Sequence, residues 1–200
     1  MKRHLPLLSL AGLIGSAVSA TAHPPQCHSM DLGGATQAGF LHPFTGLDHL
    51  LVMVAVGLWA VQIGGRALWL LPCSFVGTMM LGGAIGLGGV HYPLVEHGIL
   101  ASIVLLGVAL GIAWRPSVLV SALCVGAAGL CHGYAHGSET PSSALPLMFF
   151  IGMVIATSLL HTFGIGGGLL MNRNPKIAVA GRATGLLLIA FAVYDFCFPL

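Results

Sequence analysis

Charged side chains are scarce in this chain of 200 residues. Only 6% of the residues are Asp, Glu, Lys or Arg, whereas 56% are hydrophobic. The mean hydropathy is +0.97, and soluble proteins usually carry about 25% charged residues. This shortage of charge excludes an ordinary soluble domain and predicts a membrane protein. The five cysteines are odd in number and lie mostly in apolar runs, so no disulfide framework is expected.

The first 22 residues have the pattern of a secretory signal peptide. Lys2 and Arg3 form a positive start, Leu5 to Val18 form a short apolar run, and small residues follow. The apolar run is shorter than the roughly 20 residues that cross a bilayer. We therefore expect cleavage after Ala20 or Ala22. Without Lys2 and Arg3, the seven basic residues become five and equal the five acidic ones, so no nucleic-acid partner is expected.

The rest of the chain contains six apolar segments long enough to cross a bilayer. They are residues 45–64, 67–90, 95–114, 116–134, 145–170 and 177–198. We therefore predict an all-α, polytopic membrane protein: a six-transmembrane-helix bundle over residues 45–200, after a periplasmic N-terminal segment, residues 23–44. Four G-x-x-x-G pairs, such as Gly129 to Gly133, predict close contacts between the helices.

The basic residues indicate how the bundle is oriented. Arg66 lies in the first predicted loop, Arg115 in the third, and Arg173 and Lys176 in the fifth, while the second and fourth loops contain no Lys or Arg. Because positive residues favour the cytoplasmic side, the odd loops are expected in the cytoplasm and both mature termini in the periplasm. A cleaved signal peptide predicts the same external N-terminus. We therefore expect a multi-pass protein of the bacterial inner membrane.

Histidines and carboxylates from three segments are predicted at one level of the bundle. His49 is 17 residues before Arg66, and His132 is 17 residues after Arg115, so each lies about 25 Å from its arginine in a helix. Glu96 and His97 reach a similar height, about 27 to 28 Å from Arg115. This layer also contains Asp48, His136 and Glu139, and His42 lies just outside it. Ionisable residues inside membranes are costly and usually mark ion paths, so the layer predicts a metal site.

The spacing of two motifs supports this interpretation. In HPFTGLDHLL, His42 and His49 are seven residues apart and would share a helix face if the helix began by Pro43. Asp48 would then either bind metal itself or orient a neighbouring imidazole. In CHGYAHGSE, His132 and His136 are four residues apart, a spacing that lets two imidazoles hold one ion.

Three further residues have open roles. His161 is predicted about 18 Å from Arg173, deeper in the membrane than the layer, and with Asp195 it forms either a second step of an ion path or a packing hydrogen bond. His23 would stand first or third in the mature chain, and at the third position its imidazole and the terminal amine would suit nickel or copper. The alternative is an ordinary polar leader.

Together, HPFTGLDHLLVMVAVG and CHGYAHGSE resemble the two signature motifs of the HupE/UreJ family of bacterial nickel (or cobalt) permeases. The first motif has the H-x5-D-H form and the second the H-G-x-A-H-G form. The similarity extends over nearly the whole chain, including the signal peptide and the six-span layout. Cys131 departs from the aromatic residue expected there. Because a buried cysteine behaves as a small hydrophobic residue, we expect it to pack rather than bind metal.

The resemblance implies a permease and not an enzyme, with no cofactor, whose substrate is Ni²⁺ or Co²⁺. By family association the metal would supply hydrogenase or urease maturation. Imidazole ligands bind nickel, cobalt, zinc and copper alike, so the choice of nickel rests on the family. The candidate metal ligands are His23, His42, Asp48, His49, Glu96, His97, His132, His136 and His161.

Functions of other classes remain open at this point. An intramembrane zinc hydrolase would use similar ligands, although the chain lacks H-E-x-x-H and G-x-S-x-G. A haem-binding electron carrier would use facing histidines, but neighbouring carboxylates suit a harder cation. A periplasmic metal sensor or scaffold would share every one of these residues and would differ only in not moving the metal across.

Overall fold

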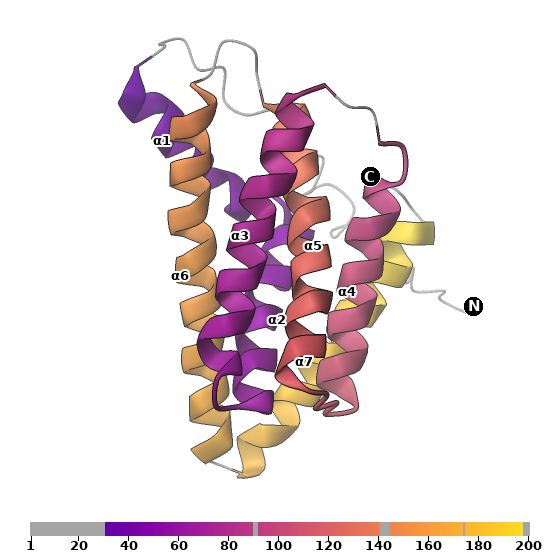
Figure 1. Cartoon of the computed structure of the whole chain (residues 1–200). Coiled ribbons are helices and arrows are strands. Elements are labelled where there is room, and N and C mark those ends of the chain that lie inside the picture. Colours follow the sequence, from indigo (N-terminus) through magenta and orange to yellow (C-terminus); the bar gives the residue numbers. More distant parts are fainter. Residues whose placement is uncertain (1–30, 90–91, 141–144, 174, 198–200) are drawn as a thin grey trace, which may run out of the picture.

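The computed structural model describes residues 31–89, 92–140, 145–173 and 175–197, and within these ranges every regular element is a helix (Figure 1). The elements are α1 (Leu32–Leu41), the 3-10 helix η2 (His42–Phe44), α2 (Leu47–Ile63), α3 (Ala67–Leu87), α4 (Val95–Gly111), α5 (Val118–Glu139), α6 (Pro146–Arg173) and α7 (Pro175–Cys197). The predicted all-α class is confirmed. The predicted signal peptide and His23 lie outside the described residues.

Each of the six predicted apolar segments corresponds to one helix, α2 to α7. Three of the described helices, α3, α5 and α6, are long and apolar enough to cross a membrane. A fourth candidate span results when α1, η2 and α2 are taken together as one bent element. Helix α4 is apolar but shorter. The structure thus supports a membrane protein with three to four candidate spans by length and composition, and the count of six stays a prediction.

The chain before α2 differs from the expected course. The shared helix face considered for His42 and His49 required a helix that began by Pro43, and the structure does not have one. Pro43 lies in η2, and Gly46 has an extended backbone (φ −104°, ψ 124°) that separates η2 from α2. The chain bends by 79° there. Helix α1, within the segment predicted as a periplasmic leader, packs against α6. An added Cβ on Gly39 would collide with the carbonyl oxygen of Phe149. Because Gly39 has no side chain, the backbones of α1 and α6 touch here.

Glycines bring the other helices together in the same way, as the G-x-x-x-G pairs predicted. An added Cβ on Gly133 of α5 would collide with the carbonyl oxygen of Met79 on α3, and one on Gly137 with the carbonyl oxygen of Gly83. Gly107 of α4 and Gly185 of α7 oppose each other similarly. Such contacts replace the hydrophobic effect, which gives no drive for helix association within lipid.

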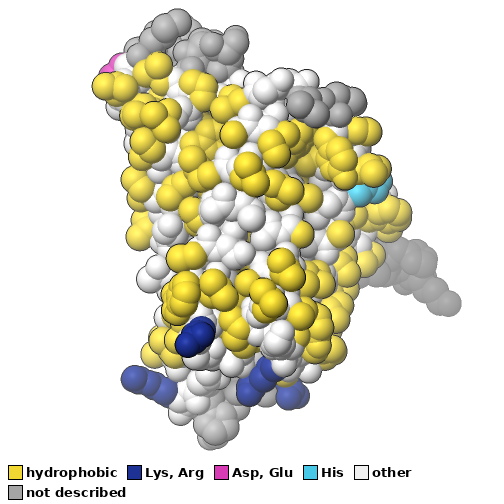
Figure 2. All heavy atoms as spheres, in the orientation of Figure 1, with side chains coloured by type: hydrophobic (Ala, Val, Ile, Leu, Met, Phe, Trp, Pro, Cys, Tyr) yellow, Lys and Arg dark blue, Asp and Glu magenta, His cyan; other side chains and the backbone are white. Residues whose placement is uncertain are grey.

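The bundle has two chemically different ends. Figure 2 shows Lys and Arg side chains gathered at one end of the visible face, and Arg66, Arg115 and Arg173 lie at or beside the ends of α3, α5 and α6 there. We call this the arginine end. The opposite end contains His42, at the bend, and His136, in the last turn of α5. We call it the histidine end.

The contact between α3 and α5 can be tested at Gly133. We expect Gly133→Ala to lower the free energy of unfolding by about 1–3 kcal/mol, because the new methyl group has no space against the Met79 carbonyl group. Gly77→Ala on α3 is the control, since nothing lies within 4 Å of an added Cβ there, and alanine favours a helix over glycine. Thermal unfolding in one detergent compares the two. Equal stability would contradict the tight contact.

Candidate metal site

Four histidines meet at the histidine end, and we call them the histidine cluster: His42, His49, His132 and His136. His42 comes from the bend in η2, His49 from the first turns of α2, and the other two from α5. The ring of His49 lies 4.5 Å from that of His136 and 5.1 Å from that of His132, between centroids. The ring of His42 lies 6.0 Å from that of His49. The bend at Gly46, rather than a continuous helix face, brings His42 beside His49.

His42 joins the cluster through a direct contact with α5. Its Nε2 lies 2.9 Å from Nδ1 of His136, and the two rings are edge to face at 4.6 Å. The ring of Phe149, on α6, also packs edge to face against His42, at 5.5 Å between centroids. His42 is half-buried whereas His136 is buried. The imidazole at the bend is therefore held between α5 and α6 at the exposed side of the cluster.

Asp48 orients His49, one of the two roles expected for it. The carboxylate oxygen Oδ2 lies 2.8 Å from Nδ1 of His49. A carboxylate accepts, so Nδ1 of the neutral imidazole carries the hydrogen and Nε2 retains its lone pair. This Nε2 is buried and has no hydrogen-bond partner among the described residues. Asp48 thus leaves the second nitrogen of His49 available as a metal ligand.

Ser102 of α4 has the same effect on His132, and the sequence analysis missed it. Its hydroxyl donates to the carbonyl oxygen of Ile99 at 2.6 Å and lies 3.1 Å from Nε2 of His132. A hydroxyl has a single hydrogen, so it accepts the hydrogen of Nε2. Nδ1 of His132 then carries the lone pair, and it has no partner in the described part of the chain. Serine in an apolar helix gives too weak a pattern to predict this contact.

Glu139 completes a set of three possible ligands. One donor atom from each of His42, His136 and Glu139 lies within 4.8 Å of the others, close enough to share one ion. Glu139 was placed in the ionisable layer but not among the candidate ligands, although it is three residues after His136 and so on the same helix face. Its carboxylate is exposed, which places the mouth of the cluster there.

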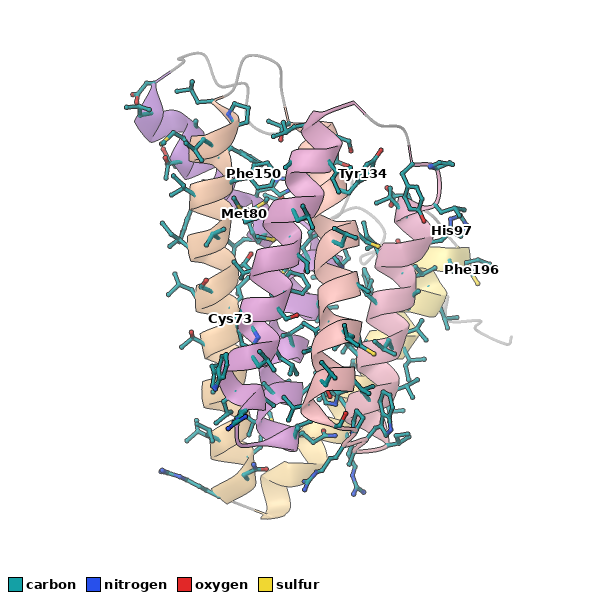
Figure 3. All side chains as sticks on the ribbon, in the orientation of Figure 1. Cys73, Met80, His97, Tyr134, Phe150 and Phe196 are labelled. Atoms are coloured by element: carbon teal, nitrogen blue, oxygen red, sulfur yellow. The ribbon has the colours of Figure 1, made fainter. Side chains whose placement is uncertain are left out.

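The remaining predicted ligands lie outside the cluster. Glu96 and His97 are exposed in the first turn of α4, and Figure 3 shows His97 at the start of that helix. Glu96 still lies close enough to Glu139 to influence its ionisation electrostatically, as does Asp48. His161 is buried on α6, apart from the four clustered rings. His23 lies outside the described residues.

The unpartnered nitrogens are the strongest sign of a ligand. Nε2 of His49, Nδ1 of His132 and Nε2 of His136 are all buried, with no hydrogen-bond partner among the residues the structure describes. Leaving a buried polar atom unpaired costs about 1–3 kcal/mol. A bound divalent cation would accept these lone pairs. The donor set of imidazoles with carboxylates suits nickel, cobalt, zinc or copper.

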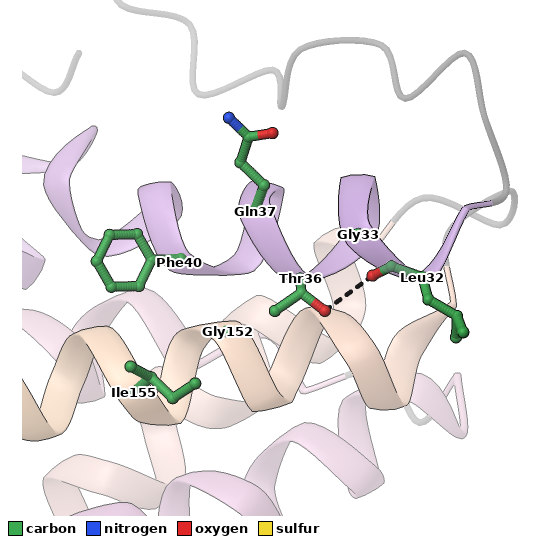
Figure 4. A pocket seen from close by; sticks show the side chains of 7 residues that line it. All are labelled: Leu32, Gly33, Thr36, Gln37, Phe40, Gly152 and Ile155. Carbon is green, nitrogen blue, oxygen red and sulfur yellow. Dashed lines mark hydrogen bonds between the residues drawn. The ribbon is translucent and has the colours of Figure 1, made fainter.

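Cys131 and two cavities do not contribute to this site. The Sγ of Cys131 packs against Gly98 of α4, as expected of a small apolar residue. A groove of about 540 Å³ between α1 and α6 is lined by apolar groups and Gln37, and Thr36 donates there to the carbonyl oxygen of Leu32 (Figure 4). A second cavity, at the arginine end, is lined by Arg115 and Arg182, whose charge repels cations.

Comparison with known proteins agrees with the motifs. The sequence profile described as "HupE / UreJ protein" matches residues 11–194. The chain belongs to the HupE/UreJ family. It is similar to Protein HupE of Rhizobium leguminosarum bv. viciae, with 40% identity over 157 residues that cover 78% of this chain and 82% of the relative. No solved structure matches the chain. Family membership and the apolar helices together make this HupE/UreJ protein a multi-pass membrane protein.

Metal binding at the cluster can be tested by comparing two histidines. We expect His136→Ala to weaken binding of Ni²⁺ or Co²⁺ at least about tenfold, because the ring of His136 adjoins two others. His97→Ala is the matched control, since His97 is exposed outside the cluster, and its affinity should stay near that of the unmodified protein. Equilibrium dialysis measures both. Equal losses in the two variants would contradict the cluster.

Acid should weaken the same binding. Imidazole binds a metal only through a neutral nitrogen, so protons and metal compete for the cluster. As the pH falls and protons occupy the imidazole nitrogens, the apparent affinity for metal therefore falls. Dialysis between pH 8 and pH 3 checks this. Binding that stays constant over this range would indicate ligands other than imidazole.

Proposed function

We propose that this HupE/UreJ protein is a secondary transporter that imports a divalent transition-metal ion across the inner membrane. The observation that supports this function best is a set of three buried imidazole nitrogens, from His49, His132 and His136, that have no hydrogen-bond partner among the described residues. They lie at one end of an apolar bundle, beside the carboxylates of Asp48 and Glu139. In a membrane, such groups are costly unless they bind an ion.

The proposed orientation follows from the two ends of the bundle. Basic residues favour the cytoplasmic side, so the arginine end would face the cytoplasm and both mature termini the periplasm. The histidine end then faces the periplasm, and its mouth near Glu139, an exposed residue, receives the hydrated ion. The cluster replaces the ion's water ligands with imidazole nitrogens and a carboxylate oxygen.

Carboxylates near the cluster suit a cationic substrate. Glu139 lies close enough to Glu96 and Asp48 for their charges to act on its carboxylate, and the charge of Asp48 also acts on Asp195 of α7. Four of the five acidic residues of the chain thus surround the mouth and the cluster. Their negative charge raises the local concentration of cations and offsets part of the cost of removing a dication from water.

The membrane potential suffices as a driving force. One elementary charge moving through 100 mV gains about 2.3 kcal/mol, so a dication gains about 4.6 kcal/mol. The chain has no G-x-x-x-x-G-K-[ST] loop for a nucleotide, and the proposal needs none. Ni²⁺, or alternatively Co²⁺, is proposed as the substrate from the family resemblance, since the ligand types also suit zinc and copper. The proposed destination of the metal is hydrogenase or urease maturation.

Uptake by the purified protein tests the function. We expect proteoliposomes to accumulate radioactive nickel only when an inside-negative potential is imposed. A sensor, a scaffold or a zinc hydrolase with the same ligands would bind metal without accumulating it. Tight binding with no potential-dependent uptake would therefore contradict the proposed transporter.

Asp48→Asn should abolish this uptake while the protein remains folded and inserted. The variant removes the negative charge beside His49 and weakens the hold on its ring, for which a loss of about 10–100-fold is typical. Asp31→Asn is the matched control: Asp31 caps α1 by accepting from the amide of Gly33, and asparagine caps a helix equally well. Normal uptake by Asp48→Asn would remove Asp48 from the mechanism.

A further inference from the structure

His161 is a buried histidine whose role the cluster does not explain. It lies in the middle of α6 with 1% of its surface exposed. Both ring nitrogens, Nδ1 and Nε2, are buried and lack a hydrogen-bond partner among the described residues. A histidine kept for packing alone would cost more free energy here than leucine, because both polar atoms have lost water and gained nothing. The side chain therefore indicates a ligand.

One aromatic ring separates His161 from the cluster. Phe75 of α3 lies edge to face with His161, at 5.3 Å between centroids, and its ring is also 5.8 Å from that of His132. Phe75 is fully buried. Helices α3 and α5 run from the arginine end and α6 runs toward it, so His161 is the next imidazole inward from His132.

Two further donor atoms lie one helical turn away, on the side toward the cluster. Thr157 precedes His161 by four residues on α6, and Met79 follows Phe75 by four on α3, so each pair shares a helix face. The hydroxyl of Thr157 lies 3.9 Å from the sulfur of Met79. Both residues are at most 1% exposed. An imidazole, a hydroxyl and a thioether thus line one buried seam between α3 and α6.

We propose that this seam is a second, inner binding station for the transported cation, with His161 as its main ligand and Met79 and Thr157 as the groups passed on the way. This inference rests on the proposed transport function. Imidazole with thioether selects borderline and soft metals and disfavours magnesium and calcium, which prefer oxygen. The inner station therefore adds selectivity after the carboxylate-rich mouth, which attracts any dication.

Helix α2 packs tightly against α6 beside this station. An added Cβ on Gly57 of α2 would collide with the carbonyl oxygen of His161, and one on Gly164 of α6 with that of Val54. The backbones of α2 and α6 are thus in contact beside His161.

The experiment compares binding and uptake in the full-length protein, with Ni²⁺ as the probe. His161→Leu removes both nitrogens without breaking a hydrogen bond, and we expect cluster binding within about threefold of normal but uptake reduced at least about tenfold. Met79→Leu should slow uptake in the same direction, whereas Met80→Leu, on the neighbouring position of α3, should not. His161→Gln serves as a second variant if the leucine protein is unstable.

Measuring nickel binding separately from nickel uptake distinguishes the inner station from the proposed transport function. In a His136→Ala background, where the cluster is weakened, we expect the residual nickel binding to weaken at least about tenfold further on adding His161→Leu. If His161→Leu lowers this residual binding but the unmodified protein does not accumulate nickel, the proposed transport function is wrong and the inner site stands. If His161→Leu or His161→Gln accumulates nickel at the normal rate, or if adding His161→Leu leaves the residual affinity of His136→Ala unchanged, the inner station is wrong.

Discussion

The proposed metal site depends on buried imidazole nitrogens that have no hydrogen-bond partner in the described part of the apolar bundle. Three belong to the histidine cluster and two to His161. Elsewhere in the bundle, polar side chains find partners on the backbone: Trp59 and Gln62 both donate to carbonyl oxygens near the arginine end. Unpaired polar atoms are thus concentrated on these histidines, and the contacts of Asp48 and Ser102 decide which nitrogen of His49 and of His132 stays free.

Two backbone devices place these rings. The extended Gly46 turns the chain between η2 and α2, and this turn lets His42 meet His136 from a different element than His49. The glycine seam between α3 and α5 removes the side chains that would hold the helices apart, so that Phe75 lies against His132. In both cases a glycine sets the geometry and a larger residue supplies the chemistry. The polar site therefore depends on close apolar packing.

Much of this arrangement could be predicted from the sequence. The lengths of the apolar segments predicted the helices α2 to α7. Counting residues from the arginines placed His49 and His132 at one level, and the distance of 5.1 Å between their ring centroids confirms it. The bend before α2 was missed because Gly46 and Pro43 are also compatible with a helix start. The contact of Ser102 with His132 joins residues 30 apart on facing helices, which periodicity along one helix cannot reveal. Glu139 was not predicted as a ligand, although its spacing of three residues from His136 places both on one helix face.

The most direct measurement of the central claim is the X-ray absorption spectrum of nickel bound to the purified protein. The account predicts a first shell of nitrogen and oxygen with the multiple-scattering signal of at least two imidazoles, because the rings of His49 and His136 are 4.5 Å apart with their Nε2 atoms free. The imidazole signal should fall in His136→Ala. A shell of oxygen alone, unchanged by that substitution, would contradict the account.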